Sequence, residues 1–202
     1  MAEEILDIGI RPIDRILGGG IPSGSVMALL GNSTSDKTDL TLRFISRGFE
    51  LGQPGLYVTF TSVPLSSHLK RLKDKVRYQA LFTTDEPLFL STNELSSLDL
   101  ILGTIEEGAV GRMVLDRPEI LGLRGMEKWF KGLEDILSKA RYMGMGTMVL
   151  GGSGYLDICD YISEGMIEIN RNEDGRRSVN LLKWPVNEGQ KVTESEVGEW
   201  TR

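Results

Sequence analysis

The chain has 202 residues, a net charge of −6 and a sequence pI of about 5.0. This length suits one well-packed domain, and the acidic balance argues against a protein that holds nucleic acid by neutralising its phosphates. No apolar run approaches the roughly 20 residues that a membrane helix needs, and the acidic first six residues lack the pattern of a secretory signal. The single cysteine, Cys159, suits a reducing cytosol, so we expect a cytoplasmic protein.

Short apolar runs alternate with helical patterns over the first 150 residues. Five runs are typical of buried strands and lie at residues 26–30, 56–60, 88–90, 113–115 and 147–150. Apolar spacing predicts helices over residues 40–49, 98–105 and 126–143, and Pro64 is suited to open another. This order predicts an α/β fold of three layers, in which helices cover both faces of a mainly parallel sheet.

The last part of the chain has a different pattern. Residues 166–170 and 178–183 flank a turn at residues 172–175, which predicts an antiparallel hairpin at one edge of the sheet. Residues 187–202 are polar and acidic. We therefore expect a single domain over residues 1–186, followed by a loose tail over residues 187–202.

The first buried strand leads into a candidate phosphate-binding loop, at the sheet edge where open parallel sheets bind ligands. Such a loop has glycine first, a second glycine before its lysine, and Ser or Thr last. Gly31, Lys37 and Thr38 are in register, whereas Asp36 replaces the second glycine. The candidate nucleotide-binding residues here are Gly31, Asn32, Ser33, Thr34, Ser35, Asp36, Lys37 and Thr38.

Asp36 argues against tight phosphate binding. At about 5 Å and an effective dielectric near 20, its carboxylate and one phosphate charge repel by about 3 kcal/mol. Alternatively, Asp36 pairs with Lys37 and fills the site itself. Since aspartate tolerates left-handed backbone angles, we expect the loop to keep its shape while losing affinity. Taken alone, the octapeptide is more typical of a helix-capping turn than of a phosphate-binding loop.

Further motifs surround this loop in a fixed order. Ahead of it lie Gly9-Ile10, Ile13-Asp14, Gly18-Gly19-Gly20-Ile21-Pro22 and Gly24-Ser25, and after it lie Phe44, the turn at residues 52–55 and Tyr57-Val58-Thr59-Phe60. Residues 112–116, 160–162, 166–169 and 180–184 continue the series. In order and spacing, these motifs resemble the KaiC branch of the RecA superfamily. The resemblance implies a RecA-like P-loop fold that binds ATP, with Thr38 and Asp116 as magnesium ligands.

The chain departs from that family at functional positions. Where the family has two glutamates, one of which orients the attacking water, this chain has Thr61 and Ser62, so we expect no catalytic residue there. Lys183 remains of a family Lys-spacer-Arg motif that reaches the neighbouring subunit's phosphate, but Pro185 replaces the arginine. Asp116 is followed by Arg117, so it is either a remnant of the magnesium site or a strand-end carboxylate paired with Arg117.

Together these changes predict a pseudo-ATPase with lost or very weak ATPase activity, which binds no cofactor or only weakly binds ATP or ADP with magnesium. We expect a regulatory or protein-interaction module whose partner is a second copy or a related RecA-like ATPase. A divergent working ATPase in DNA repair, recombination or signalling is the alternative. Nucleic-acid binding is disfavoured, because the loops after the fourth and fifth strands are short and poor in Lys and Arg.

Three further features of the sequence concern its basic residues, its cysteine and its composition. The basic residues between His68 and Arg77 are expected on the solvated face of a helix, with His68 on the surface rather than in a catalytic role. Cys159 is expected to be a packing residue. The three glutamines and one histidine are compatible with a thermophilic source.

Overall fold

The computed structural model describes residues 4–32, 34–53, 55–60, 88–91, 97–106, 110–120, 126–174, 176–184 and 191–192. Its strands are β1 (Ile5–Leu6), β2 (Ile21–Pro22), β3 (Val26–Leu30), β4 (Gly55–Thr59), β5 (Leu88–Ser91), β6 (Arg112–Asp116), β7 (Gly146–Leu150), β8 (Gly165–Arg171), β9 (Arg177–Lys183) and β10 (Lys191–Val192). Its helices are α1 (Arg11–Ile16), α2 (Thr34–Glu50), α4 (Ser97–Glu106), α5 (Met126–Tyr142), the 3-10 turn η3 (Ser153–Tyr155) and α6 (Leu156–Ile162).

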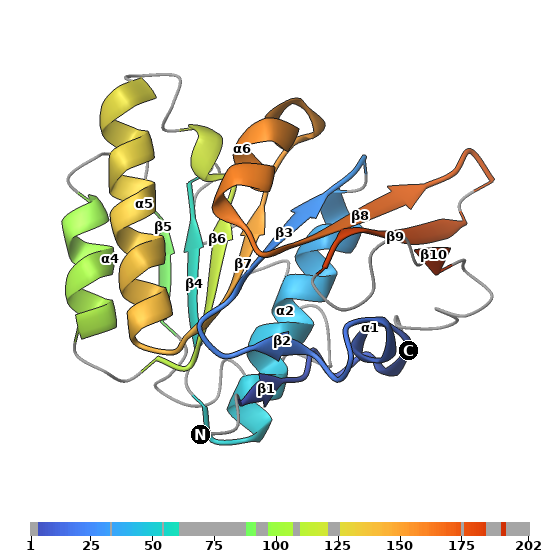
Figure 1. The fold of residues 1–202 in the computed structure, drawn as a ribbon, viewed down its shortest axis with the longest axis horizontal. Coiled ribbons are helices and arrows are strands. Elements are labelled where there is room, and N and C mark those ends of the chain that lie inside the picture. The colour runs from blue at the N-terminus through green and yellow to red at the C-terminus, as the bar shows by residue number, and fades with distance from the viewer. Residues whose placement is uncertain are drawn as a thin grey trace.

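The main sheet has the strand order β10-β9-β8-β3-β7-β6-β4-β5 (Figure 1). Strands β5, β4, β6, β7, β3 and β8 run parallel, and β9 and β10 continue the sheet in antiparallel pairing. The central strands β3, β6 and β7 are buried along their whole length, which explains their continuous apolar sequences. The predicted mainly parallel α/β fold with an edge hairpin is therefore confirmed.

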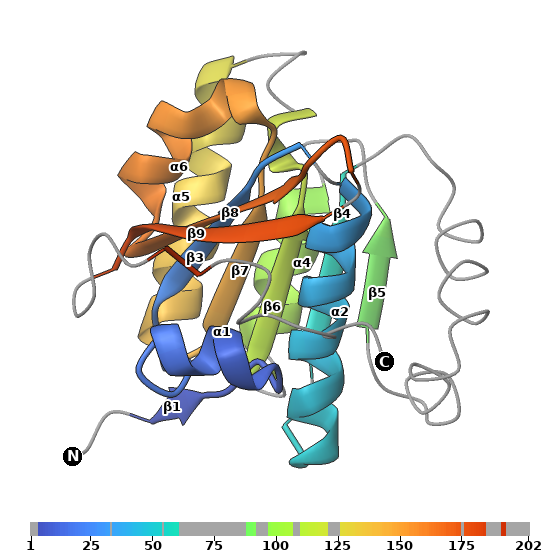
Figure 2. The ribbon, with the colours of Figure 1, turned by 90° about the vertical axis from the view of Figure 1, so that its right-hand side faces the viewer.

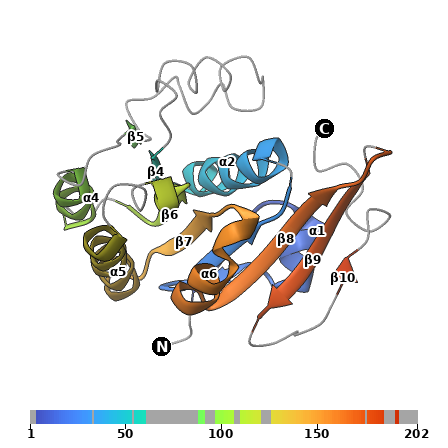
Figure 3. The same cartoon turned by 90° about the horizontal axis from the view of Figure 1, so that it is seen from above.

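Helices cover both faces of this sheet. Figure 2 shows α1 and α2 on one face and α5 and α6 on the other, and Figure 3 shows the same layers from above with α4 beside α5. One apolar core lies under α1 and α2 and includes Phe44 and Trp184, and a second lies under α4 and α5 around Trp129. None of the described helices is long and apolar enough to cross a membrane.

Arg112 connects several segments at the end of the sheet that lies away from the candidate loop. Its side chain is fully buried at the start of β6, and it donates hydrogen bonds to the carbonyls of Asp7 and Phe44 and to Gln53 Oε1. Its guanidinium also lies 4.7 Å from the centre of the Phe44 ring. One cation thus joins the N-terminal segment, α2 and the turn before β4.

The elements that the sequence did not predict are short. The β1–β2 pair, α1, α6 and β10 each have between two and seven residues, too few for a periodic pattern to emerge. β10 is formed by two residues of the expected tail and pairs with β9. The predicted helix after Pro64, with its basic residues and His68, lies outside the described residues.

Candidate functional site

Gly31 directly follows β3, at a point where only glycine fits. Its φ is 113°, and a Cβ atom built there would lie 2.0 Å from the carbonyl oxygen of Ile169 in β8. A side chain would therefore be strained by its own backbone angle and would collide with the neighbouring strand. The glycine allows the first part of the candidate loop to lie directly against β8.

Asn32 ties the loop to the end of the same strand. Its backbone N–H donates to Asn170 Oδ1 at 3.1 Å, and its side-chain amide donates to the carbonyl of Arg171 at 3.2 Å. In return, the N–H of Arg171 donates to Asn32 Oδ1 at 2.8 Å. The amide that a phosphate-binding loop would present to its ligand is thus used within the protein.

Helix α2 begins inside the predicted loop. The loop expected over residues 31–38 is shorter in the structure, because residues from Thr34 onward are helical. Among the described residues other than glycine, the only positive φ is that of Arg117, so Asp36 does not adopt the left-handed angles expected for it. A helical aspartate in the first turn is stabilised by the helix dipole and needs no unusual backbone angle.

Asp36 is held by two arginines of the β8–β9 hairpin. The Nε and Nη2 atoms of Arg171 lie 3.1 and 2.8 Å from its two carboxylate oxygens, and Arg177 Nε lies 2.8 Å from Oδ1. Only 1% of the residue is exposed to solvent. The alternative in which Asp36 pairs with Lys37 was wrong, since the fork geometry of arginine suits a carboxylate better and the hairpin supplies two of them.

Lys37 points to the other side of the loop. Its Nζ atom donates to the carbonyls of Gly31 and Gly151, both at 2.9 Å, and only 5% of the residue is exposed. Burial lowers the pKa of Lys37, and the nearby carboxylate of Glu119 opposes this shift. The lysine that the motif assigns to phosphate oxygens is thus bonded to two backbone oxygens.

Asp116 ends β6 as predicted and is buried there. Its Oδ2 atom accepts a hydrogen bond of 3.1 Å from the hydroxyl of Tyr57, whose pKa lies well above its usual value, mainly because of burial and then because of the charge of Asp116. Arg117, the proposed partner of Asp116, adopts a φ of 60° and lies 3.5 Å from Glu119 Oε1.

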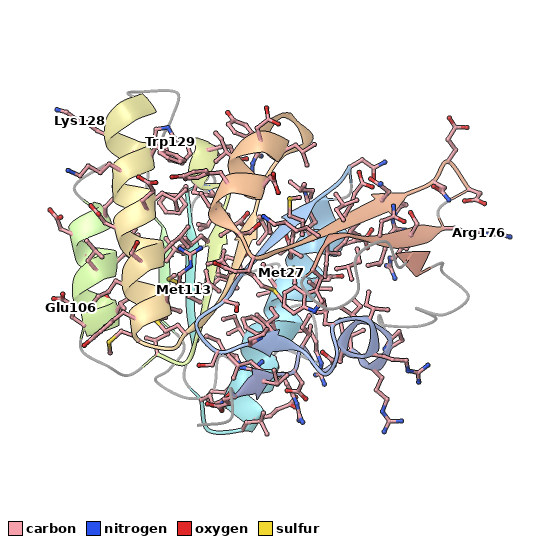
Figure 4. All side chains as sticks on the ribbon, viewed as in Figure 1. Met27, Glu106, Met113, Lys128, Trp129 and Arg176 are labelled. Atoms are coloured by element: carbon pink, nitrogen blue, oxygen red, sulfur yellow. The ribbon has the colours of Figure 1, made fainter. Side chains whose placement is uncertain are left out.

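Glu119 is a site residue that the sequence analysis missed. It is buried, its Oε1 atom has no hydrogen-bond partner among the described residues, and burial raises its pKa. It lines a small pocket with Trp129, Cys159 and several aliphatic side chains. Trp129, labelled in Figure 4, lies on α5 on the side toward α6. The sequence did carry a signal for this residue. Glu119 is a carboxylate three residues after Asp116, and it directly follows Pro118 beyond the end of the strand.

Lys183 lies at the far end of β9 from this site. Its Nζ atom donates to the carbonyls of Asp160 and Ser163 at the end of α6, at 2.7 and 2.8 Å, and pairs with the Asp160 carboxylate. It is six positions along the strand from Arg177, a span of about 20 Å. The structure thus brings together residues 31–32 and 36–37 with Glu119, but not Lys183. Residues 61, 62 and 185 lie outside the described part of the chain.

Part of the sequence and the overall fold match those of known proteins. The family model described as "ATPase: KaiC" matches residues 6–107, about half of the 202 residues. The chain belongs to the KaiC family. A KaiC-like protein from the hyperthermophilic archaeon Pyrococcus horikoshii has the same fold, with a TM-score of 0.77 and 22% identity over 94% of this chain and 93% of that protein.

Curated relatives of this KaiC-family chain match over shorter stretches. A UPF0273 protein of Methanopyrus kandleri is 38% identical over 65 residues, which make up 32% of this chain and 26% of that protein. The DNA repair protein RadA of Mycolicibacterium smegmatis is 30% identical over 108 residues, or 54% of this chain and 21% of RadA. The circadian clock protein KaiC of Prochlorococcus marinus is 37% identical over 65 residues, or 32% of this chain and 13% of that KaiC. The chain thus spans about a quarter or less of these relatives.

Proposed function

We propose that this KaiC-family domain is a pseudo-ATPase, which keeps the fold of an ATPase but works as a regulatory or protein-interaction module. The observation that carries this proposal is the closure of the loop onto its own hairpin through Asn32 and Asp36. A loop that binds phosphate must leave its backbone amides and its lysine free to meet the ligand. Here Asn32, Asp36 and Lys37 of the loop bind parts of the same chain.

The described residues do not fit a polyphosphate in the way the family motif implies. Seating one would require the Asn32 amide to leave Asn170 and Lys37 to leave two carbonyls, at about 1 kcal/mol for each hydrogen bond. It would also place phosphate charge near the carboxylate of Asp36. Thr38 and Asp116 could still hold magnesium, but Asp116 already accepts from Tyr57. We therefore propose that ATP or ADP binds weakly or not at all.

The proposed partner is a protein, either a second copy of this chain or a related RecA-like ATPase. Support comes from an aromatic patch on the helical face opposite α2. Tyr161 of α6 is 72% exposed, and its ring lies 5.8 Å from that of Phe130 in α5. Tyrosine is enriched at protein interfaces because its ring is apolar and its hydroxyl polar. Sedimentation of the wild type and of Tyr161→Ser would show whether this patch supports self-association.

A phosphate-release assay tests the loss of catalysis. The wild type is incubated with ATP and magnesium beside Lys37→Ala, a variant that lacks the lysine which contacts the β- and γ-phosphates in working loops of this kind. We expect the two proteins to release phosphate at the same background rate. Turnover by the wild type that clearly exceeds turnover by Lys37→Ala would reject the proposal.

Glu119 favours a second candidate function, a divergent working ATPase. A buried carboxylate with a raised pKa near the loop lysine has the properties of a general base. It would replace the family glutamates whose positions hold Thr61 and Ser62. This alternative predicts that Glu119→Gln and Lys37→Ala both abolish a measurable wild-type rate. It is excluded if no wild-type rate above background exists.

A further inference from the structure

Arg171 and Arg177 are directly opposite each other across the β8–β9 ladder. Like charges in this position destabilise a sheet, unless an anion lies between them. The turn between the two strands keeps them in place, since the N–H of Asn172 donates to the carbonyl of Arg176 at 2.7 Å. The register of the hairpin therefore fixes the backbones of Arg171 and Arg177 opposite each other.

The anion between them is the carboxylate of Asp36. Its side chain is 2% exposed, whereas the side chains of Arg171 and Arg177 are 41% and 18% exposed. Arg171 binds both carboxylate oxygens and Arg177 binds one, which is the arrangement that paired arginines adopt on carboxylates and phosphates. Figure 2 shows the tip of the hairpin beside the start of α2. Asp36 lies in the first turn of that helix.

We propose that Arg171 and Arg177 form an oxyanion-binding site that Asp36 fills from within the chain. The external ligand of this site is a phosphate group, because phosphate offers the same pair of oxygens to the Arg171 fork and a third to Arg177. The inference rests on the proposed function in treating the loop as closed onto the hairpin. Arg171 and Arg177 are the groups that close the loop, and phosphate is the external ligand that they accept.

The internal carboxylate prevents external anions from binding in the wild type. Because Asp36 is attached to the same fold, its effective concentration at the arginines is in the millimolar range or above. A free anion must exceed this concentration to replace it. Shortening Asp36 to a neutral side chain removes the competitor and leaves both arginines in place.

The experiment titrates inorganic pyrophosphate into Asp36→Ser and the wild type by calorimetry, at constant ionic strength maintained with chloride. Serine is tolerated in the first turn of a helix, so α2 keeps its start. We expect pyrophosphate to bind Asp36→Ser at least tenfold more tightly than the wild type. The thermal midpoint of Asp36→Ser should also rise when pyrophosphate is added, because a ligand that binds only the folded state stabilises that state.

Matched controls separate this site from a general change in charge. Asp39→Ser removes one negative charge from the next turn of α2 and should bind pyrophosphate as the wild type does. In the Asp36→Ser background, adding Arg177→Ala should abolish the gain. Adding Arg176→Ala should not, since that arginine is 75% exposed at the hairpin tip and pairs with Asp174.

Two results would overturn the proposal. One is a folded Asp36→Ser protein that binds pyrophosphate no better than the wild type, and the other is a gain that survives Arg171→Ala together with Arg177→Ala. If Asp36→Ser does not fold, Asp36→Asn keeps the volume of the side chain and must show a gain that depends on Arg177. The proposed function fails by a different result, which is ATP turnover by the wild type.

Discussion

Asp36 and Arg171 form a two-pronged ion pair between the first turn of α2 and the end of β8. Both carboxylate oxygens are engaged, at 2.8 and 3.1 Å, by two nitrogen atoms of one guanidinium. Asp36 occupies the position at which the family motif has glycine. The aspartate at this position argues against phosphate binding. Its carboxylate also makes the contact that holds the hairpin to the helix.

Replacing Asp36 by asparagine should destabilise the fold. The amide keeps the volume but loses the charge that three N–H groups of Arg171 and Arg177 approach. We expect the free energy of unfolding to fall by about 2 kcal/mol, a moderate value because Arg171 is 41% exposed. Urea denaturation measures the change. Asp135→Asn, at an exposed position of α5, is the control, and an equal loss of stability in both variants would contradict the role of the Asp36 ion pairs.

Gly31→Ala should be more disruptive than alanine at another glycine with positive φ. The added methyl group would meet the Ile169 carbonyl at 2.0 Å, whereas at Gly52, with a φ of 72°, no atom lies within 4 Å. We expect a loss of about 3 kcal/mol or more for Gly31→Ala and about 1 kcal/mol for Gly52→Ala. Thermal unfolding compares the two. Similar midpoints would show that the loop does not press against β8.

Glu119 should give the stability a particular dependence on pH. Burial raises its pKa above the usual 4.5, so the folded chain holds this proton more tightly than the unfolded chain does. The resulting stability is present below pH 4.5 and is lost as the pH rises through the raised pKa. Glu119→Gln does not ionise, so it should gain stability relative to the wild type as the pH increases. If the wild type instead became more stable relative to Glu119→Gln as the pH rises, the burial of Glu119 would be contradicted.

Arg112→Met tests the contacts by which Arg112 joins three segments at the other end of the sheet. The variant removes the donor from three acceptors, which are the backbone carbonyls of Asp7 and Phe44 and the side-chain Oε1 of Gln53. We expect a loss of about 3 kcal/mol in denaturant titrations, as is usual when a buried charged partner is removed. Arg176→Met on the exposed hairpin tip should change stability by less than about 0.5 kcal/mol. A tolerated Arg112→Met would show that the packing of Phe44 is sufficient without the cation.

Much of the fold could be predicted because its signals are local. The apolar runs that became β3, β6 and β7 are continuous in sequence, and α2 buries Leu40 and Phe44 four residues apart. The RecA-like order and the KaiC family followed from motifs of fixed spacing. Short elements such as α6 escaped detection because seven residues carry too little periodicity.

The site was harder to predict, because its contacts join distant parts of the chain. Asp36 and Arg177 are 141 positions apart and meet only because β8 lies beside β3 in the sheet. The local sequence suggested Lys37, the adjacent cation, as the partner of Asp36. Glu119 was missed for the same reason, since its nearness to Lys37 depends on how the segment after β6 turns back toward Gly151.

The most direct test of the closed loop is a calorimetric titration of the wild-type protein with ATP and magnesium. We expect no saturable heat up to about 1 mM nucleotide, since the Asn32 amide, Lys37 and the arginines of the hairpin are all engaged within the chain. Saturable binding in the micromolar range that is lost in Lys37→Ala would contradict it.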